Sequence, residues 1–394
     1  MRCTRILAAI AVAFAACNAT TANGSDAATT AAGQTGNALD ALVHDVCKKD
    51  IVLLGEDANH GSGRTFAVKT QLVRRLVEQC HFDAVVFESQ VYDFIELQHA
   101  FDRKTATAEQ VGAAIGGLWS KASASKPLVD YLFRQARTGR VTLAGIDPQI
   151  GGATQLYTQQ QLPAVLARHL AGSSRTACEA ELARLTNWQY DDTTQYDDAT
   201  RARLRTCLTE IRAAITGQSA SREMLEAEHM ASNLLRYLDM ASGNEFNVRD
   251  RAMFDNLEWQ IARLPKGTKV LVWCASVHAA KAAMPDTEGT PMGRYIHDAY
   301  SDRAAAIGFS ARSGSFGRPG KTPTVLDTTA QESLESRVFA SDGNTDDFRY
   351  VDHAKLARFG AITARALNYR QPQAANWATL LDGMVVLREE QPLP

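Results

Sequence analysis

The sequence predicts an α/β fold, with a mainly parallel sheet flanked by helices and a helical insertion that covers its cleft. Short apolar runs such as 51–54 and 84–87 are continuous, not alternating, which is typical of strands buried on both faces. The stretch 65–79 between them carries apolar residues on a helical period, so the three segments form a βαβ unit. From 155 to 244 the chain is polar and helical with few strand signals, which predicts the insertion.

The α/β core is expected over 41–154 and 245–394, on either side of the insertion. Its remaining elements, in chain order, are helices within 93–138, a strand within 139–147, a helix from about 247, a strand from Lys269, and strands at 304–309 and 382–388. The residues from 310 to 324 are rich in Gly, Ser and Arg, so we expect a loop there.

The start of the chain has the composition of a secretory signal. A basic beginning precedes the apolar run 6–16, and small residues follow it, so we expect a signal peptide over 1–22. A lipoprotein signal is the alternative, because Cys17 follows a Phe-Ala-Ala sequence and would be the lipid-anchored residue. Residues 23–40 are rich in Ala, Thr and Gly and are expected to be a flexible leader. The predicted location is periplasmic or secreted.

Charge and hydropathy exclude two classes of partner. A net charge of -2 over 394 residues argues against a nucleic-acid-binding protein. After the signal, no apolar stretch is long enough to cross a membrane. The charge therefore implies no electrostatic partner.

Five further cysteines follow Cys17, and an exported chain can oxidise them. Cys47 and Cys80 each lie four residues before a predicted strand, so a disulfide between them is expected. Cys178 and Cys207 lie on two helical stretches that could pack antiparallel and form a second disulfide, which leaves Cys274 unpaired. The alternative is five reduced cysteines packed as small core residues.

Polar side chains follow four of the predicted strands. In chain order they are Glu56, Asp57 and His60, then Glu88, then Asp147, and then His278. Because the carboxyl ends of parallel strands meet at one edge of a sheet, these groups should face a common cleft. A histidine beside carboxylates can activate water as a general base, whereas the same set could also hold a divalent metal ion. Spacing alone does not separate these two chemistries.

Seven segments follow one another between residues 55 and 295 in an order typical of one known family. They are Gly55-Glu-Asp-Ala-Asn-His-Gly, Phe66 with Lys69, Phe87-Glu-Ser, Gly145-Ile-Asp-Pro-Gln, Asn247-Val-Arg-Asp-Arg-Ala-Met, Trp273-Cys-Ala-Ser-Val-His and Met292-Gly-Arg-Tyr. Together they resemble the erythromycin esterase family. The resemblance implies an α/β core with a helical part over the cleft, and a hydrolase that acts on ester bonds without a cofactor. Characterised members hydrolyse the macrolactone ester of macrolide antibiotics.

The resemblance also implies roles for individual residues. His60 matches the base that activates water, Glu88 the acid on the second strand, and His278 the last histidine of the later motif. The acid that supports His60 is either Glu56, four residues before it, or Asp57, three before it. Together with Asp57, the residues expected to bind substrate are Lys69, where characterised members tend to carry arginine, Asp147 and Arg249.

Two other functions fit the same residues. One is a metal-dependent hydrolase, such as a peptidase, because the motifs also resemble a wider superfamily with putative metalloproteases. The other is a small-molecule-binding protein that has kept the cleft and lost the chemistry, since the later motif reads Ala275-Ser-Val-His where the family has His-Asn-Ala-His.

Overall fold

The computed structural model describes residues 38–394 except for six short internal segments, which are 152–155, 217–220, 241–244, 285–288, 328–329 and 341–345. The predicted signal peptide over 1–22, including Cys17, lies outside the described residues, as does most of the leader expected over 23–40. Residues 38–46 are helical, so the last three residues of that expected leader already belong to a helix.

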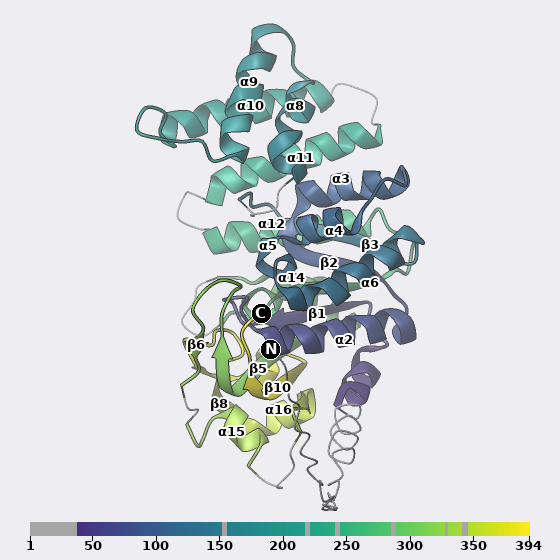
Figure 1. Ribbon diagram of the computed structural model, residues 1–394, viewed down its shortest axis with the longest axis vertical. Coiled ribbons are helices and arrows are strands. Elements are labelled where there is room, and N and C mark those ends of the chain that lie inside the picture. The colour runs from purple at the N-terminus through teal and green to yellow at the C-terminus, as the bar shows by residue number, and fades with distance from the viewer. Residues whose placement is uncertain are drawn as a thin grey trace, which may run out of the picture.

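An eight-stranded sheet forms the middle of the molecule (Figure 1). Its strands lie in the order β3-β2-β4-β1-β5-β10-β7, with β6 paired to β5 off this path. The bounds are β1 Ile51–Glu56, β2 Phe82–Gln90, β3 Thr142–Asp147, β4 Lys269–Ala275, β5 Ala304–Phe316, β6 Thr324–Val325, β7 Phe348–Asp352 and β10 Gly383–Glu390. Only β6 and β7 pair antiparallel in this sheet. The predicted fold class, α/β with a mainly parallel sheet, is confirmed.

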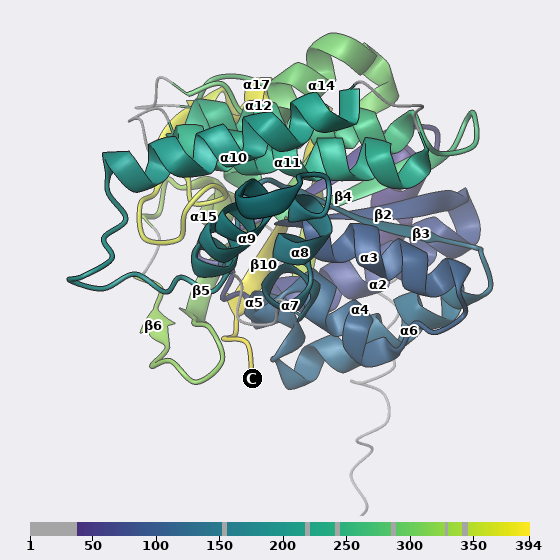
Figure 2. The same cartoon turned by 90° about the horizontal axis from the view of Figure 1, so that it is seen from above.

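Helices cover both faces of the sheet (Figure 2). Successive residues of β1 point into two core layers, with Val52 and Leu54 in one and Ile51 and Leu53 in the other, which explains why the run is continuously apolar. The first layer is built with α2 Gly63–Cys80, α3 Val91–Asp102, α4 Ala108–Ile115 and α6 Lys126–Arg137. The second is built with α12 Glu245–Ile261 and α14 Met292–Tyr300. Two short helices, α5 Gly117–Ser120 and α13 Ser276–Ala279, complete this part.

The stretch predicted to be the insertion is helical and stacks at one end of the molecule (Figure 1). It contains α7 Leu156–Gln160, α8 Leu162–Ala167, α9 Gly172–Thr186, α10 Asp198–Thr216 and α11 Arg222–Met240. These helices share a separate apolar cluster with the face of α3 that carries Val91 and Ile95. The insertion therefore rests on the core through α3 and through α12, whose Asn256 and Asp255 bind Asn233 and Arg236 of α11.

The opposite end is formed by the C-terminal region, which packs around Trp377. Its elements are α15 Leu334–Val338, α16 His353–Phe359, α17 Trp377–Leu380 and the hairpin of β8 Ala361–Ala364 with β9 Gln373–Asn376. The expected end of β5 at Phe309 is wrong, because the strand continues to Phe316. Its polar second half is held by pairing with β10, in which Ser313 faces Glu389 and Gly314 faces Glu390. Pairing, not apolar patterning, sustains that half of the strand.

Both predicted disulfides are present, between Cys47 and Cys80 and between Cys178 and Cys207, with Cα atoms 5.1 Å and 5.4 Å apart. Cys274 is free and buried, as expected. The first disulfide joins the segment before β1 to the end of α2, and the second joins α9 to α10. Two disulfides are compatible with an exported protein. Within the described ranges, no helix combines the length and apolar character needed to cross a membrane.

Candidate active site

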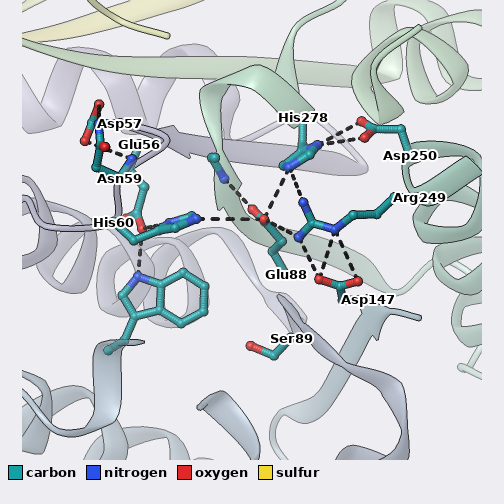
Figure 3. Close-up of polar contacts among 12 residues, drawn as sticks. Glu56, Asp57, Asn59, His60, Glu88, Ser89, Asp147, Arg249, Asp250 and His278 are labelled. Carbon is teal, nitrogen blue, oxygen red and sulfur yellow. Dashed lines mark hydrogen bonds and ion pairs between the residues drawn. The ribbon is translucent and has the colours of Figure 1, made fainter. Parts of the chain in front are cut away.

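A cavity of about 710 Å³ opens at the carboxyl ends of the first four strands. Five of the predicted site residues line it: His60 from the turn after β1, Glu88 from β2, Asp147 from β3, Arg249 from α12 and His278 from α13. Figure 3 shows His60, His278 and Arg249 around Glu88, with Asp147 on the far side of Arg249. The other three predicted residues, Glu56, Asp57 and Lys69, do not line the cavity and lie behind it.

The turn after β1 holds the ring of His60. Gly55 is required at the strand end, because a Cβ there would lie 2.7 Å from the Cα of Ser276. His60 itself has φ 54°, in the left-handed region that few side chains adopt, and its N–H donates to the carbonyl of Asp57 over 2.9 Å. A strained residue of this kind, fixed by its surroundings, commonly marks a functional position.

Glu56, and not Asp57, is hydrogen-bonded to the ring of His60. Its carboxylate accepts hydrogen bonds from Nδ1 of His60 at 2.9 Å, Nζ of Lys69 at 2.8 Å and Nε1 of Trp119 at 2.7 Å. Burial alone would raise the pKa of Glu56, but Lys69 and His60 outweigh it and lower that pKa. An ionised Glu56 keeps the ring proton on Nδ1, so Nε2 is left as a base that faces the cavity.

Lys69 binds Glu56 on the side away from the cavity. Its side chain is fully buried, and its ammonium lies 4.0 Å from the centre of the Trp273 ring. Burial lowers the pKa of Lys69, and the charge of Glu56 opposes that shift. Lys69 therefore balances the charge of Glu56, and it does not reach the space where a substrate would lie.

Asp57 accepts hydrogen bonds mainly from neighbouring backbone groups and none from the ring of His60. It accepts hydrogen bonds from the N–H of Tyr369 at 2.7 Å and from the N–H and side-chain amide of Asn59, both at 3.1 Å. Burial raises the pKa of Asp57, although these hydrogen bonds counteract it. The contacts fix the beginning of the turn that carries His60 against the C-terminal region.

Glu88 lies between the two histidines. It accepts hydrogen bonds from the N–H of Ala275 at 2.7 Å and from Arg249 at 2.8 Å. Nε2 of His278 lies 3.3 Å from its carboxylate, and Nε2 of His60 lies 3.9 Å away. Burial would raise the pKa of Glu88, but His278 and Arg249 lower it well below its usual value.

Arg249 connects Glu88 to Asp147. Its guanidinium donates to both oxygens of Asp147, at 2.6 Å to 3.3 Å, as well as to Glu88. Burial would lower the pKa of Arg249, but the two carboxylates raise it above its usual value. The guanidinium is thus a fixed positive charge in the cavity wall.

His278 is held by Asp250, a site residue that motif reading did not assign. Nδ1 of His278 lies 2.9 Å from Asp250, which also accepts from the N–H of Met292 at 2.7 Å. Burial favours the neutral ring, but Glu88 and Asp250 raise the pKa of His278 to about 9. The protonated ring can donate through Nε2 to Glu88, whereas the neutral ring can accept from Arg249 at 2.9 Å.

The remaining walls are mostly apolar and come from outside the insertion. Trp119 packs edge-on against His60 with ring centres 5.2 Å apart, and Phe246 stacks on His278 at 5.5 Å. Ile115 and Ile150 extend these walls. No described residue of α7 to α11 lines the cavity, so the prediction that the insertion covers the cleft finds no direct contact there. Trp119 was missed at the sequence level because nothing in Gly117-Leu-Trp-Ser marks it as a partner of Glu56.

A metal centre requires several ligands directed at one point. In the described part of the chain, no three His, Cys, Asp or Glu side chains are arranged in that way. Nδ1 of His60 and Nδ1 of His278 are instead directed at carboxylates, and Glu88 is bound by Arg249. This donor set does not fit the metal-dependent alternative.

Comparisons with known proteins relate the chain to one family and to solved structures of the same fold. The family model described as erythromycin esterase matches residues 77–382, which include Glu88, Asp147, Arg249 and His278 but begin after His60. A putative hydrolase, YbfO of Bacillus subtilis (strain 168), is 23% identical over 326 residues, covering 75% of this chain and 72% of the relative. Among solved structures, a Bacillus cereus protein has a TM-score of 0.69 at 19% identity, covering 91% of this chain and 92% of that one. A mutant of the erythromycin esterase EreC in its open conformation has a TM-score of 0.67 at 16% identity, covering 90% and 94%.

Proposed function

Because the chain belongs to the erythromycin esterase family, we propose that it is a hydrolase that cleaves an ester or lactone by attack of water, with His60 as the general base. The observation that carries the proposal is the geometry of His60, whose Nδ1 is bound to Glu56 while Nε2 faces the cavity. The similarity to a relative named as a putative hydrolase supports the reaction class. The proposed substrate is a small molecule, since the cavity has the volume typical of ligand sites.

In the first step, a water molecule gives a proton to Nε2 of His60 as its oxygen attacks the ester carbonyl carbon. The resulting imidazolium is stabilised by Glu56, whose charge is in turn fixed by Lys69 and Trp119. Because these donors are already in place, little reorganisation is needed when the ring becomes charged.

Negative charge then develops on the carbonyl oxygen. Arg249 also lines the cavity, and its Nη1, which is bound to Nε2 of His278, has a second N–H that can donate to that oxygen. When the tetrahedral intermediate collapses, the bond from carbon to the leaving oxygen breaks, and the proton held on Nε2 of His60 passes to that oxygen. The products are a carboxylic acid and an alcohol, or a hydroxy acid from a lactone.

The test is His60→Asn assayed against a panel of p-nitrophenyl esters. We expect kcat to fall by about 10³-fold, the range typical for loss of a general base, with the melting temperature little changed. His297→Asn is the matched control, because His297 is exposed on α14 and does not line the cavity. Activity retained in His60→Asn would refute the assigned role, and a wild-type protein inactive on every ester would favour the binding-protein alternative.

The same assay with and without a chelator tests the cofactor-free chemistry that we propose. Unchanged activity supports it. Loss of activity that a divalent ion restores would overturn it and favour the metal-dependent hydrolase.

We also propose that the protein is exported, and that the signal peptide expected over 1–22 directs it. The two disulfides support this proposal. Fractionation of the producing cell would test it, since a protein recovered with reduced cysteines inside the cytoplasm would contradict it.

A further inference from the structure

Most of the charged groups in the cavity are matched by a charge of opposite sign. Arg249 binds Asp147 and Glu88. His278 faces Asp250 and Glu88, and His60 binds Glu56. Arg318 also lines the cavity, but no carboxylate among the described residues lies within ion-pair distance of it. The cavity therefore carries one cation whose charge is not balanced by a described neighbour.

The backbone at Arg318 is fixed beside the turn that carries His60. The N–H of Gly317 donates to the carbonyl of Gly61 over 2.9 Å, and the carbonyl of Gly317 accepts from Leu393 over 3.0 Å. The two backbone segments approach so closely that a Cβ on Gly61 would lie 2.8 Å from the backbone of Gly317. The position of Arg318 relative to His60 is consequently set by main-chain contacts.

The side chain of Arg318 is oriented as well. Its Nε–H donates to the carbonyl of Asn59, the residue just before His60, over 2.8 Å. That is its only hydrogen bond to a described residue, so neither terminal nitrogen of the guanidinium is bound within the described part of the chain. An arginine fixed through Nε presents these two nitrogens as a planar fork, which fits a carboxylate or phosphate.

We infer that Arg318 is a specificity-determining residue that binds an anionic group of the substrate. This inference rests on the proposed ester hydrolysis and adds a substrate class, namely esters that carry a carboxylate or phosphate some atoms away from the scissile carbonyl. The group would lie at the cavity mouth, because Arg318 is itself exposed to solvent. Cationic esters should be the poorest substrates, since no described carboxylate at this position offsets the guanidinium.

The test compares three phenyl esters of similar size, with an anionic acyl group (phenyl hemisuccinate), a neutral one (phenyl valerate) and a cationic one with a trimethylammonium group. In the wild-type protein, we expect kcat/KM to be highest for the anionic ester and lowest for the cationic one. Arg318→Gln should reduce the anionic-to-neutral ratio of kcat/KM about three- to tenfold, mainly through KM, as expected for one charged contact near solvent. Arg318→Lys should keep part of the ratio, because it retains the charge but loses the fork.

Two controls separate this contact from a general effect of charge. Arg312→Gln removes the same charge from an exposed position on β5 that does not line the cavity, and should leave the ratio unchanged. Raising the salt concentration should lower the ratio in the wild-type protein and have little effect in Arg318→Gln. Equal ratios in the wild-type protein and Arg318→Gln would overturn the inference while leaving ester hydrolysis intact.

A binding measurement tests Arg318 independently of turnover. The amide analogue of the anionic ester, N-phenylsuccinamic acid, should bind the wild-type protein more tightly than Arg318→Gln by a similar three- to tenfold factor in calorimetry. If no ester is hydrolysed but this difference is found, the proposed reaction fails and the anion site stands. If the analogue binds both proteins equally, the anion site fails.

Discussion

The two histidines of the cavity are held by the same type of contact but differ in the charges around it. Nδ1 of each ring faces a buried carboxylate, Glu56 for His60 and Asp250 for His278. Glu56 is also bound by Lys69, and Glu88 lies 3.9 Å from Nε2 of His60 but 3.3 Å from Nε2 of His278. Against burial and Arg249, the carboxylates of Glu88 and Asp250 raise the pKa of His278 to about 9. His278 is thus arranged to carry a proton, whereas the carboxylate that holds His60 is shared with a lysine.

The largest expected effect comes from removing the support of His60. Glu56→Gln should lower kcat by about 10³-fold, because the ring loses the group that fixes its tautomer and stabilises its charged form. It should also reduce the free energy of unfolding by about 3 kcal/mol, since Lys69 would be buried without a counter-charge. Activity assays and urea unfolding measure the two losses.

A double variant separates the loss of activity from the loss of stability. Glu56→Gln combined with Lys69→Met removes the unpaired charge, so most of the stability should return while the activity stays low. Asp130→Asn, which breaks the exposed pair with Lys126, should cost no more than about 1 kcal/mol and serves as the surface control. Activity restored in the double variant would show that Glu56 does not support the base.

The surroundings of His278 predict an intermediate effect that depends on pH. A folded-state pKa of about 9, above the usual 6.5, means that the stabilisation is fully present below pH 6.5 and is lost as the pH rises through 9. Asp250→Asn removes one of the two carboxylates and should lower that pKa. The wild-type protein should therefore exceed the variant in stability by about 1–2 kcal/mol at pH 6, and this difference should shrink towards pH 9.5.

Urea unfolding of both proteins at several pH values measures this difference. A difference that stays constant from pH 6 to pH 9.5 would mean that Asp250 acts only as a hydrogen-bond acceptor for Met292 and does not stabilise a charged His278. Glu390, whose pKa burial raises to about 6, titrates in both proteins and cancels in the comparison.

The smallest expected effect concerns Trp119. Trp119→Phe keeps an aromatic ring beside His60 but removes the N–H donated to Glu56. A hydrogen bond to a charged group contributes about 1.5–3 kcal/mol, part of which water at the cavity wall can replace, so we expect a loss of about tenfold in kcat/KM. Steady-state kinetics with Trp259→Phe as the control, on α12 away from the cavity lining, measures it. A KM effect without a change in kcat would indicate that Trp119 only contacts the substrate.

Much of this arrangement could be predicted because it depends on local pattern. The continuous apolar runs identified β1, β2 and β4, and the polar residues at or beyond the ends of those runs, His60, Glu88 and His278, all line the cavity. Both disulfides followed from their positions relative to strands and helices. The expected end of β5 was wrong, since its last residues are held by β10 and not by an apolar pattern.

Other features depend on contacts between distant parts of the chain. Glu56 and Asp57 are adjacent in sequence, but only packing shows that Glu56 turns towards Lys69 and Trp119 while Asp57 turns towards Tyr369. The sequence by itself determined six of the strands, the order of the strand-end residues and the family resemblance, because strand burial and motif order are written along the chain; it did not indicate β6, β7, β8 or β9, which are short or half-exposed. The tertiary structure decided which acid supports His60, that Asp250 supports His278, and that Arg318 lies at the cavity mouth, because these pairings depend on where separate elements meet.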